Sequence, residues 1–375
     1  MFKAIMRYRI KMLKCLTRQI SWAKHCTNAF MEFPTYESAK KTLNQYWPQN
    51  DADCYIEEQN IGNVVYDCTV IIPAFNAEEH LAKCLDSISC QTTHYDVQVI
   101  AINDGSTDDT GNILNRYRDF PNWEVIHQAN KGLSVSRNVG IARARGRYIM
   151  FVDADDFLTH MALENMLTVA FANDADLVVG GHQSMMPDSR TVINEKRYNT
   201  CRINPLGNVT GHAWAKLYSR RLFAHLRFPD GYWYEDSILA HIIFPLVENA
   251  YTISDIVYCH VINPRGIVNK TERNPRALES LYITELLLNE KKRFGLSHTL
   301  KDFEQFLHSV RLTYARTATC NPLVAKSIFS VQCELFAQFA SVIDTKKVSD
   351  ALVQALARRN FLAYLFAVWK SIWIY

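Results

Sequence analysis

Between residues 68 and 179, short apolar runs alternate with segments of helical periodicity. The apolar runs have the length of strands and lie at 68–73, 97–102, 123–127, 148–152 and 176–179. Helical spacing of apolar residues appears between them, at 78–90, 134–145 and 163–172. Strands that alternate with helices form parallel sheets that are covered on both faces. The sequence therefore predicts an α/β fold with a doubly wound, mostly parallel sheet.

Polar side chains follow three of these predicted strands, at the points where the strands end. Residues 73–76 follow the first strand, residues 103–106 the second, and residues 153–155 the fourth. An open α/β sheet binds its ligands outside the carboxyl ends of the strands. We therefore expect the three clusters to face a common crevice.

Three carboxylates, Asp153, Asp155 and Asp156, crowd the end of the fourth predicted strand. Like charges at such a place require a cation or a proton to compensate them. Strand alternation puts Asp153 and Asp155 on one side, as two oxygen ligands for a magnesium or manganese ion that also binds phosphates. The other interpretation is a polar turn that caps the segment after a core strand. We place Asp156 in that capping role.

A crevice of this kind suits a nucleotide. Asp104 is placed to accept a hydrogen bond from the base, and a cation at Asp155 to hold a diphosphate. Arg137, with the backbone N–H groups that begin the 134–145 helix, offers further phosphate contacts. The chain has no G-x-G-x-x-G after its first strand and no G-x-x-x-x-G-K-[ST] loop. A dinucleotide site or a P-loop is therefore disfavoured.

The composition is that of a globular protein, since the 375 residues are 48% hydrophobic and 21% charged. The ten cysteines include no C-x-x-C pair and are typical of reduced cytoplasmic thiols. We find neither the apolar segment of a secretory signal nor a run of about eighteen apolar residues that predicts a transmembrane helix. We therefore expect a cytoplasmic protein.

Both ends of the chain have features of membrane-surface segments. Residues 1–31 contain seven Lys or Arg and no Asp or Glu, with apolar residues at helical spacing. This pattern fits a basic amphipathic helix on an anionic membrane, or a helix that is solvated or packed on a partner. Residues 361–375 are aromatic-rich with Lys370 as their only charge, which fits a membrane interface or a helical core. We expect peripheral membrane contact through both segments.

Three regions are expected along the chain: a basic extension and linker (1–65), the α/β domain that carries the strand-end clusters (66–270) and a helical region (271–375). The later part of the middle region is less regular. There the patterns predict an amphipathic segment at 211–223, an apolar helix at 237–247 and a hairpin-like β region at 251–261.

Four ordered stretches, VIIPAFNAE, NDGSTDDT, NKGLSVSRNVG and FVDADD, resemble the successive motifs of family 2 glycosyltransferases. The resemblance extends over about residues 68–265. It implies the glycosyltransferase A-type fold, with its Rossmann-like nucleotide-sugar domain. It also implies an inverting transfer from a nucleotide sugar with Mn²⁺ or Mg²⁺ as cofactor.

The resemblance also implies roles for the donor-side residues. Asp104 would bind the base of a uridine-type donor. Asp153 would lie near the ribose and the metal, and Asp155 would be the metal ligand. The loop that encloses the base would be formed by Pro73, Phe75 and Asn76.

On the acceptor side, Glu235 and Asp236 match the family's later acidic pair, whose aspartate is taken as the catalytic base. Chemistry also requires such a base, because an alcohol attacks well only when a carboxylate takes its proton. The pair would otherwise cap the 237–247 helix. Trp214 and Lys216 match a W-x-K-L-Y element that is implied to line the site, although Trp214 also fits core packing.

The chain departs from the family pattern at two places. The chain has no Q-x-x-R-W signature, so we expect one sugar to be added per encounter. Pro264-Arg265-Gly266 replaces the usual small polar run after Tyr258-Cys-His260, which leaves the roles of His260 and Arg265 open.

The expected function is transfer of one sugar from a nucleoside-diphosphate sugar to a glycan or lipid-linked acceptor in bacterial surface polysaccharide synthesis. No nucleic acid partner is expected, and the protein would lie at the inner face of the cytoplasmic membrane. Two alternatives remain. A nucleotidyltransferase would carry a Gly-rich basic loop after the first strand, and a catalytically silent nucleotide-sugar-binding protein would tolerate the loss of Asp236.

Overall fold

The computed structural model describes residues 33–57, 62–188, 191–263, 274–344 and 347–372. The chain divides into two compact units, one of residues 52–264 and one that joins residues up to 51 with those from 265 onward. The helix expected at 1–31 and the open role of Arg265 fall outside the described residues. The two units are described separately below.

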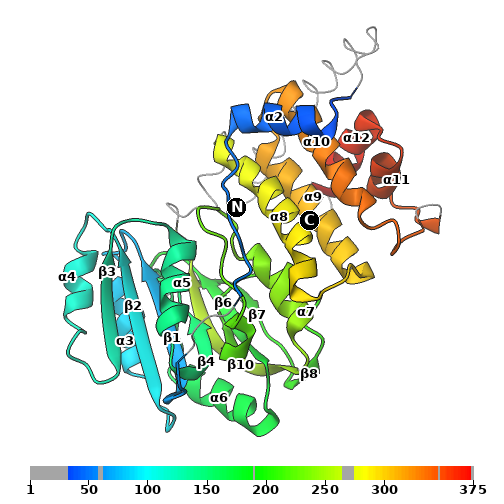
Figure 1. Cartoon of the computed structure of the whole chain (residues 1–375). Coiled ribbons are helices and arrows are strands. Elements are labelled where there is room, and N and C mark those ends of the chain that lie inside the picture. The colour runs from blue at the N-terminus through cyan, green and yellow to red at the C-terminus, as the bar shows by residue number, and fades with distance from the viewer. Residues whose placement is uncertain (1–32, 58–61, 189–190, 264–273, 345–346, 373–375) are drawn as a thin grey trace. The chain divides into compact units, whose positions relative to one another are not determined.

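The unit of residues 52–264 is built on one mixed sheet (Figure 1). Its strand order is β3-β2-β1-β4-β9-β6-β10-β5, with β7 beside β6 and β8 beside β10. The longer strands are parallel to their neighbours in the pairs β2–β3, β1–β2, β1–β4 and β6–β10, whereas the short strands pair antiparallel. The bounds are β1 Tyr66–Ala74, β2 Val97–Asp104, β3 Trp123–Gln128, β4 Gly146–Phe151, β5 Phe157–Leu158, β6 Leu177–Met185, β7 Val192–Lys196, β8 Cys201–Ile203, β9 Lys216–Ser219 and β10 Ala250–Val261.

Helices cover both faces of the sheet, which confirms the predicted doubly wound fold. Val70 and Ile72 of β1 belong to a buried cluster with residues of α3 (Leu81–Ser89) and α6 (Ala162–Asn173). On the opposite face Ile71 meets α5 (Leu133–Arg143), and a Cβ on Gly140 would lie 2.4 Å from Ile71 Cγ2. Only glycine therefore lets α5 approach β1 this closely. Because both faces are buried, β1 is an almost unbroken apolar run.

In the later part of this unit one prediction is wrong and another is confirmed with a different helix type. Residues 251–261 are not a hairpin but part of the single strand β10, whose register to β6 shifts between Thr252 and Tyr258. The exposed Ser254 and Asp255 lie in this irregular stretch and resemble a turn in the sequence. The helix expected at 237–247 is present over 237–246, but its middle, Leu239–Ile243, is π-helical and its end is the short α7, Phe244–Leu246.

The other unit is helical, as predicted from residue 275 onward. Its ordered elements are α2 Tyr36–Tyr46, α8 Glu279–Glu290, α9 Leu300–Thr317, α10 Pro322–Ala337, α11 Ala351–Ala357 and α12 Phe361–Ile372. Within it, Lys291 Nζ and Asp302 Oδ1 form a fully buried ion pair at 2.6 Å.

The terminal helix α12 combines a buried face with one exposed aromatic ring. Phe361, Tyr364, Leu365 and Val368 are buried, while Phe366 is 53% exposed. Most of its aromatic and aliphatic residues therefore serve the core of the helical unit. Within the described residues no helix is both long and apolar enough to cross a membrane. The thiols of Cys68, Cys84, Cys90, Cys201, Cys259 and Cys333 are free.

Candidate active site

The carboxyl ends of β2, β1 and β4 lie next to one another, because these strands are adjacent and parallel. The loops after them carry Asn76, Asp104 and Asp153. Tyr258, near the carboxyl end of β10, reaches the same edge, since its hydroxyl accepts the Asp153 N–H at 3.1 Å. The structure thus brings together clusters that the sequence had placed at separate strand ends.

Hydrogen bonds join the loop after β1 to the loop after β2. The Asn76 N–H donates to Ser106 Oγ at 3.0 Å, and Asn76 Oδ1 accepts from the Thr107 N–H at 2.9 Å. Asn76 has a φ of 48°, in the left-handed region that asparagine tolerates better than most residues. Phe75 projects from this loop with 49% of its surface exposed, while Pro73 lies within β1 opposite Ile102.

The Asp104 side chain holds the segment that leads into α5. Its carboxylate accepts the N–H groups of Lys131 and Gly132 at 2.9 and 2.8 Å and the side-chain amide of Gln128 at 2.7 Å. Gly105 follows with a φ of 70°, and a Cβ there would lie 2.5 Å from the Asn130 nitrogen. The N-D-G sequence therefore fixes the backbone around the start of α5.

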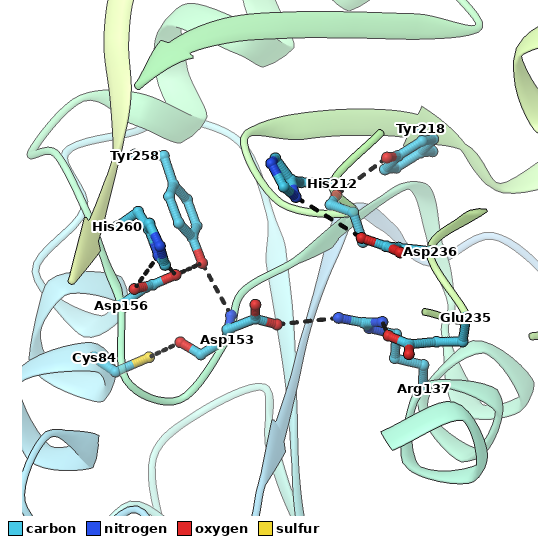
Figure 2. A network of polar contacts seen from close by, with 11 residues as sticks. Cys84, Arg137, Asp153, Asp156, His212, Tyr218, Glu235, Asp236, Tyr258 and His260 are labelled. Carbon is cyan, nitrogen blue, oxygen red and sulfur yellow. Dashed lines mark hydrogen bonds and ion pairs between the residues drawn. The ribbon is translucent and has the colours of Figure 1, made fainter. Parts of the chain in front are cut away.

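Arg137 connects the two acidic parts of the site (Figure 2). From α5 its guanidinium donates to Asp153 Oδ1 at 3.1 Å and to Glu235 Oε1. It also lies 5.3 and 5.8 Å from the ring centroids of Phe228 and Phe151, and the side chain is 3% exposed. The sequence predicted Arg137 as a phosphate ligand, and the structure places it between two carboxylates that come from distant loops.

Asp156 is buried and fastens the acidic loop to β10. Its carboxylate accepts the Val261 N–H at 2.7 Å and the Tyr258 hydroxyl at 2.8 Å, with His260 Nδ1 3.2 Å away. Burial raises the pKa of Asp156 to about 6, although His260 opposes the shift. Asp156 thus has a structural role, but it ties the loop to β10 and does not cap the segment that follows it, as the sequence had predicted it would. Asp155 remains partly exposed and accepts from Asn263 Nδ2 at 2.9 Å.

The loop that carries the acidic pair is held by α5. Asn138 accepts the Phe228 N–H and donates to the Phe228 carbonyl, both at 2.8 Å, and also donates to Asp230 at 3.0 Å. Glu235 is buried, whereas the Asp236 side chain is 35% exposed. Sequence reasoning missed Asn138, although it directly follows Arg137 in the S-R-N motif.

The W-x-K-L-Y element begins in a loop beside Asp236 and continues into β9. Trp214 is 7% exposed and stacks on Tyr258, with ring centroids 4.8 Å apart. Lys216 is buried and donates to the His212 carbonyl at 2.7 Å. Burial lowers the pKa of Lys216 to about 7, although Asp236 opposes the shift. His212, which the sequence reasoning also missed, lies with Nδ1 3.8 Å from Asp236 Oδ2.

The electrostatics of this edge favour bound cations or protons. Burial raises the pKa of Glu235 to about 7 against the opposing charge of Arg137. Burial also raises the pKa of Asp153, with Arg137 opposing the shift and Asp155 adding to it. Excess negative charge around a single arginine is the arrangement expected where a positively charged group joins the site.

The oxygen ligands at this edge fit a hard divalent cation that keeps part of its coordination shell for water and phosphate. Asp153 and Asp155 supply carboxylate oxygens, and the Asp153 side chain is 30% exposed. No group of three or more His, Cys, Asp or Glu suited to a metal is found in the part of the chain that the structure describes. Two carboxylates without a closed cage are the usual protein contribution to a magnesium site.

Comparison with known proteins agrees with this geometry. Residues 69–227 match the family described as Glycosyl transferase family 2. They belong to glycosyltransferase family 2. The resemblance of the four sequence motifs is thereby confirmed. Glu235 and Asp236 follow the matched segment.

Relatives of the chain are bacterial glycosyltransferases. It is 29% identical over 325 residues to the glycosyltransferase GlyA of Streptococcus pneumoniae, covering 81% of this chain and 46% of that protein. It is 34% identical over 215 residues to the uncharacterized glycosyltransferase EpsJ of Bacillus subtilis, covering 53% and 62%. A poly(ribitol-phosphate) beta-glucosyltransferase of Bacillus spizizenii is 35% identical over 116 residues, covering 30% and 18%. The chain thus spans about half the length of GlyA.

The fold is shared with a solved glycosyltransferase. S. aureus TarS in complex with UDP-GlcNAc superposes with a TM-score of 0.58 at 18% identity, covering 80% of this chain and 90% of that structure. At this identity the likeness concerns the fold, and it confirms the predicted glycosyltransferase A-type architecture.

Proposed function

We propose that the protein is an inverting glycosyltransferase that moves one sugar from a nucleoside-diphosphate sugar, of the UDP type, to a hydroxyl of a glycan. One observation carries the proposal. Arg137 ties Asp153, on the donor side, to Glu235, which directly precedes the half-exposed Asp236. One edge of the sheet thus carries both carboxylates that suit a diphosphate-bound cation and a carboxylate that suits the role of proton acceptor.

In the proposed reaction, the acceptor oxygen forms a bond to the anomeric carbon as the bond to the diphosphate oxygen breaks. Asp236 takes the hydroxyl proton, which typically contributes ~10²–10⁴-fold to the rate. Glu235 is buried against Arg137 and holds in place the loop that carries Asp236. Asp104 and residues 73–76 form the base side of the donor pocket, with Phe75 as its exposed ring.

A Mn²⁺ or Mg²⁺ ion bound with the donor would neutralise charge on the departing diphosphate. Asp155 and Asp153 are the residues that would hold it. Arg137 keeps Asp153 oriented by a hydrogen bond at 3.1 Å. Trp214 and Lys216 shape the side of the pocket next to Asp236, the lysine through its bond to the His212 carbonyl.

For the acceptor we propose a bacterial surface polysaccharide or a lipid-linked precursor of one. The relatives support this class, since one is a poly(ribitol-phosphate) beta-glucosyltransferase. A protein that works on such acceptors at the inner face of the cytoplasmic membrane would gain from the basic segment 1–31.

The test is a panel of UDP-, GDP-, ADP- and dTDP-sugars, each scored for thermal stabilisation and for slow hydrolysis with and without MnCl₂ or MgCl₂. We expect one UDP-sugar to be hydrolysed only with metal, and Asp155→Ala to abolish that hydrolysis. Stabilisation without hydrolysis in any metal would instead indicate a silent nucleotide-sugar-binding protein. Release of pyrophosphate from a sugar phosphate and UTP would indicate a nucleotidyltransferase.

A further inference from the structure

A stack of three aromatic rings runs from the interior of the sheet unit to its surface beside Asp236. Tyr258 is fully buried, and Trp214 lies parallel to it at 4.8 Å with an interplanar angle of 8°. The His212 ring also stacks on Trp214, at 4.7 Å and 5°. The His212 side chain is 51% exposed. The stack therefore ends in an imidazole whose inner face is covered and whose outer side is open.

The loop that presents His212 is held from several directions. The buried Lys216 ammonium donates to the His212 carbonyl at 2.7 Å, and the Tyr218 hydroxyl donates to the Ala213 carbonyl at 3.1 Å. Ala215 has a φ of 56°, a left-handed conformation that costs a non-glycine residue energy. Such strain persists where the surrounding structure over-determines it, often at functional sites. The exposed ring is thus pre-organised.

Its position relative to the proposed base is also fixed. His212 Nδ1 lies 3.8 Å from Asp236 Oδ2, and both side chains are partly exposed (Figure 2). That separation is longer than a hydrogen bond, so the ring lies alongside the carboxylate without using up its acceptor capacity. A flat group on the outer face of His212 would have its edge beside Asp236.

We propose that the outer face of His212 is the acceptor platform, on which a pyranose ring stacks with one hydroxyl directed to Asp236. This inference rests on the proposed function and specifies its acceptor as a sugar ring. The C–H groups on one face of a pyranose are apolar and complement the electron-rich face of an aromatic ring. A ring already held by Trp214 loses little freedom when a ligand binds to it.

The experiment compares the full chain with three variants, His212→Ala, His212→Phe and His94→Ala. His94 is a matched control, since it is exposed, packs on the ring of Tyr95 and lies 2.9 Å from the carboxylate of Glu164. It precedes β2, at the opposite end of that strand from Asp104. The probes are the methyl pyranosides of glucose, galactose and N-acetylglucosamine, offered to the UDP-saturated protein. Binding is read by saturation-transfer NMR, and UDP-sugar hydrolysis is measured in parallel.

We expect saturation transfer to the ring C–H protons of at least one pyranoside in the wild type. His212→Phe and His94→Ala should keep this binding, whereas His212→Ala should weaken it about tenfold, the loss typical of an aromatic contact residue. His212→Ala should lower pyranoside affinity more than it lowers donor hydrolysis, because water needs no platform.

Three outcomes would overturn the inference. They are absence of pyranoside binding by the wild type, unchanged pyranoside affinity in His212→Ala, and an equal fall of hydrolysis and binding in His212→Ala and His212→Phe. The last would make His212 a positioning residue for Asp236. Pyranoside binding that depends on His212 without hydrolysis of any nucleotide sugar would support the platform and contradict the proposed function.

Discussion

Arg137 shows how one residue type takes its role from its surroundings. A guanidinium near a strand-end loop suits phosphate, yet here it is enclosed by two carboxylates and two phenyl rings at 3% exposure. Its two acidic partners are 16 and 98 residues away in the sequence. The planar fork of arginine fits two separate carboxylates in a way that lysine does not.

The first residue-scale prediction concerns the base. Asp236→Asn keeps the shape of the side chain but removes the proton acceptor, so we expect transfer to fall by ~10²–10⁴. Thermal stabilisation by UDP should persist. Asp119→Asn, at an exposed aspartate in the loop before β3, is the control and should have normal turnover. Near-normal turnover of Asp236→Asn in a folded protein would refute the assignment.

The second prediction is a double-mutant cycle for the Arg137–Glu235 pair, measured by chemical denaturation at pH 8. Removing one partner of a buried ion pair leaves the other charge uncompensated, so we expect Arg137→Met alone to destabilise the protein by about 3 kcal/mol. Combining it with Glu235→Gln should recover part of this loss. The matched control is Arg143, on the same helix as Arg137, which forms an exposed pair with Glu124 of β3; its coupling should be below about 1 kcal/mol. If the two substitutions were additive at the Arg137–Glu235 pair as they are at the control pair, Arg137 would not hold Glu235 in place.

The third prediction follows from the raised pKa of Glu235, about 7 in the folded protein. Because the folded state keeps this proton longer than the unfolded state, stability from this group falls as pH rises from about 4.5 to 7. Relative to Glu235→Gln, the wild type should lose on the order of 1–3 kcal/mol across this window. Parallel curves of unfolding free energy against pH for the two proteins would show that burial does not shift this carboxyl.

At the scale of elements, α5 organises the site through three neighbouring residues of one helix. Arg137 binds Glu235, Asn138 binds the backbone of Phe228, and Gly140 lets the helix pack against Ile71. Because these three contacts are made by one rigid helix, α5 positions the loop that carries Glu235 and Asp236 relative to the sheet edge. The S-R-N-V-G motif is therefore a packing and positioning motif as much as a ligand motif.

The element-scale prediction tests whether Asn138 of α5 holds the loop at 228–236. Asn138→Ala leaves the buried Phe228 N–H and carbonyl without these hydrogen bonds, at a cost of about 1–3 kcal/mol. We expect faster hydrogen exchange at residues 228–236 and a lower rate of transfer, with UDP binding retained. Asn165→Ala is the control, because Asn165 donates to Asp255 at an exposed place on α6. Unchanged exchange in Asn138→Ala would mean that the loop is held by other contacts.

At the scale of the whole molecule, charge is distributed unevenly along the chain. Residues 1–31 hold seven of the 41 Lys and Arg residues and none of the 38 Asp and Glu residues, so the remaining chain has more acids than bases. The aromatic helix α12 directs most of its large side chains into the helical unit. The proposed membrane contact therefore depends mainly on the basic segment.

The whole-molecule prediction is sedimentation of the full chain with anionic phosphatidylglycerol vesicles at low salt. Binding should weaken strongly at high salt and be absent with phosphatidylcholine, since each Lys or Arg near an anionic surface contributes about 1 kcal/mol. Changing the seven basic residues to Gln should abolish binding, whereas Phe366→Ser should have little effect. If the wild type stays in the supernatant at low salt, the membrane proposal fails.

Much of the fold followed from the sequence, because strand and helix periods are local properties. The apolar runs from 68 to 179 and the polar residues at their ends gave the sheet, its two covered faces and the edge where Asp104 and Asp153 lie. The irregular β10 was not recognised as one strand, since Ser254 and Asp255 in its register shift interrupt the alternation on which strand prediction relies.

The sequence alone determined which chemistry the chain carries: strand-end carboxylates, a later acidic pair, and motifs that place the residues in one enzyme family. Only the tertiary structure decided what each side chain contacts. It put Arg137 between Asp153 and Glu235, and it put His212 at the open end of the Trp214–Tyr258 stack. These contacts depend on the packing of segments that are distant in the chain, and no local pattern encodes such packing.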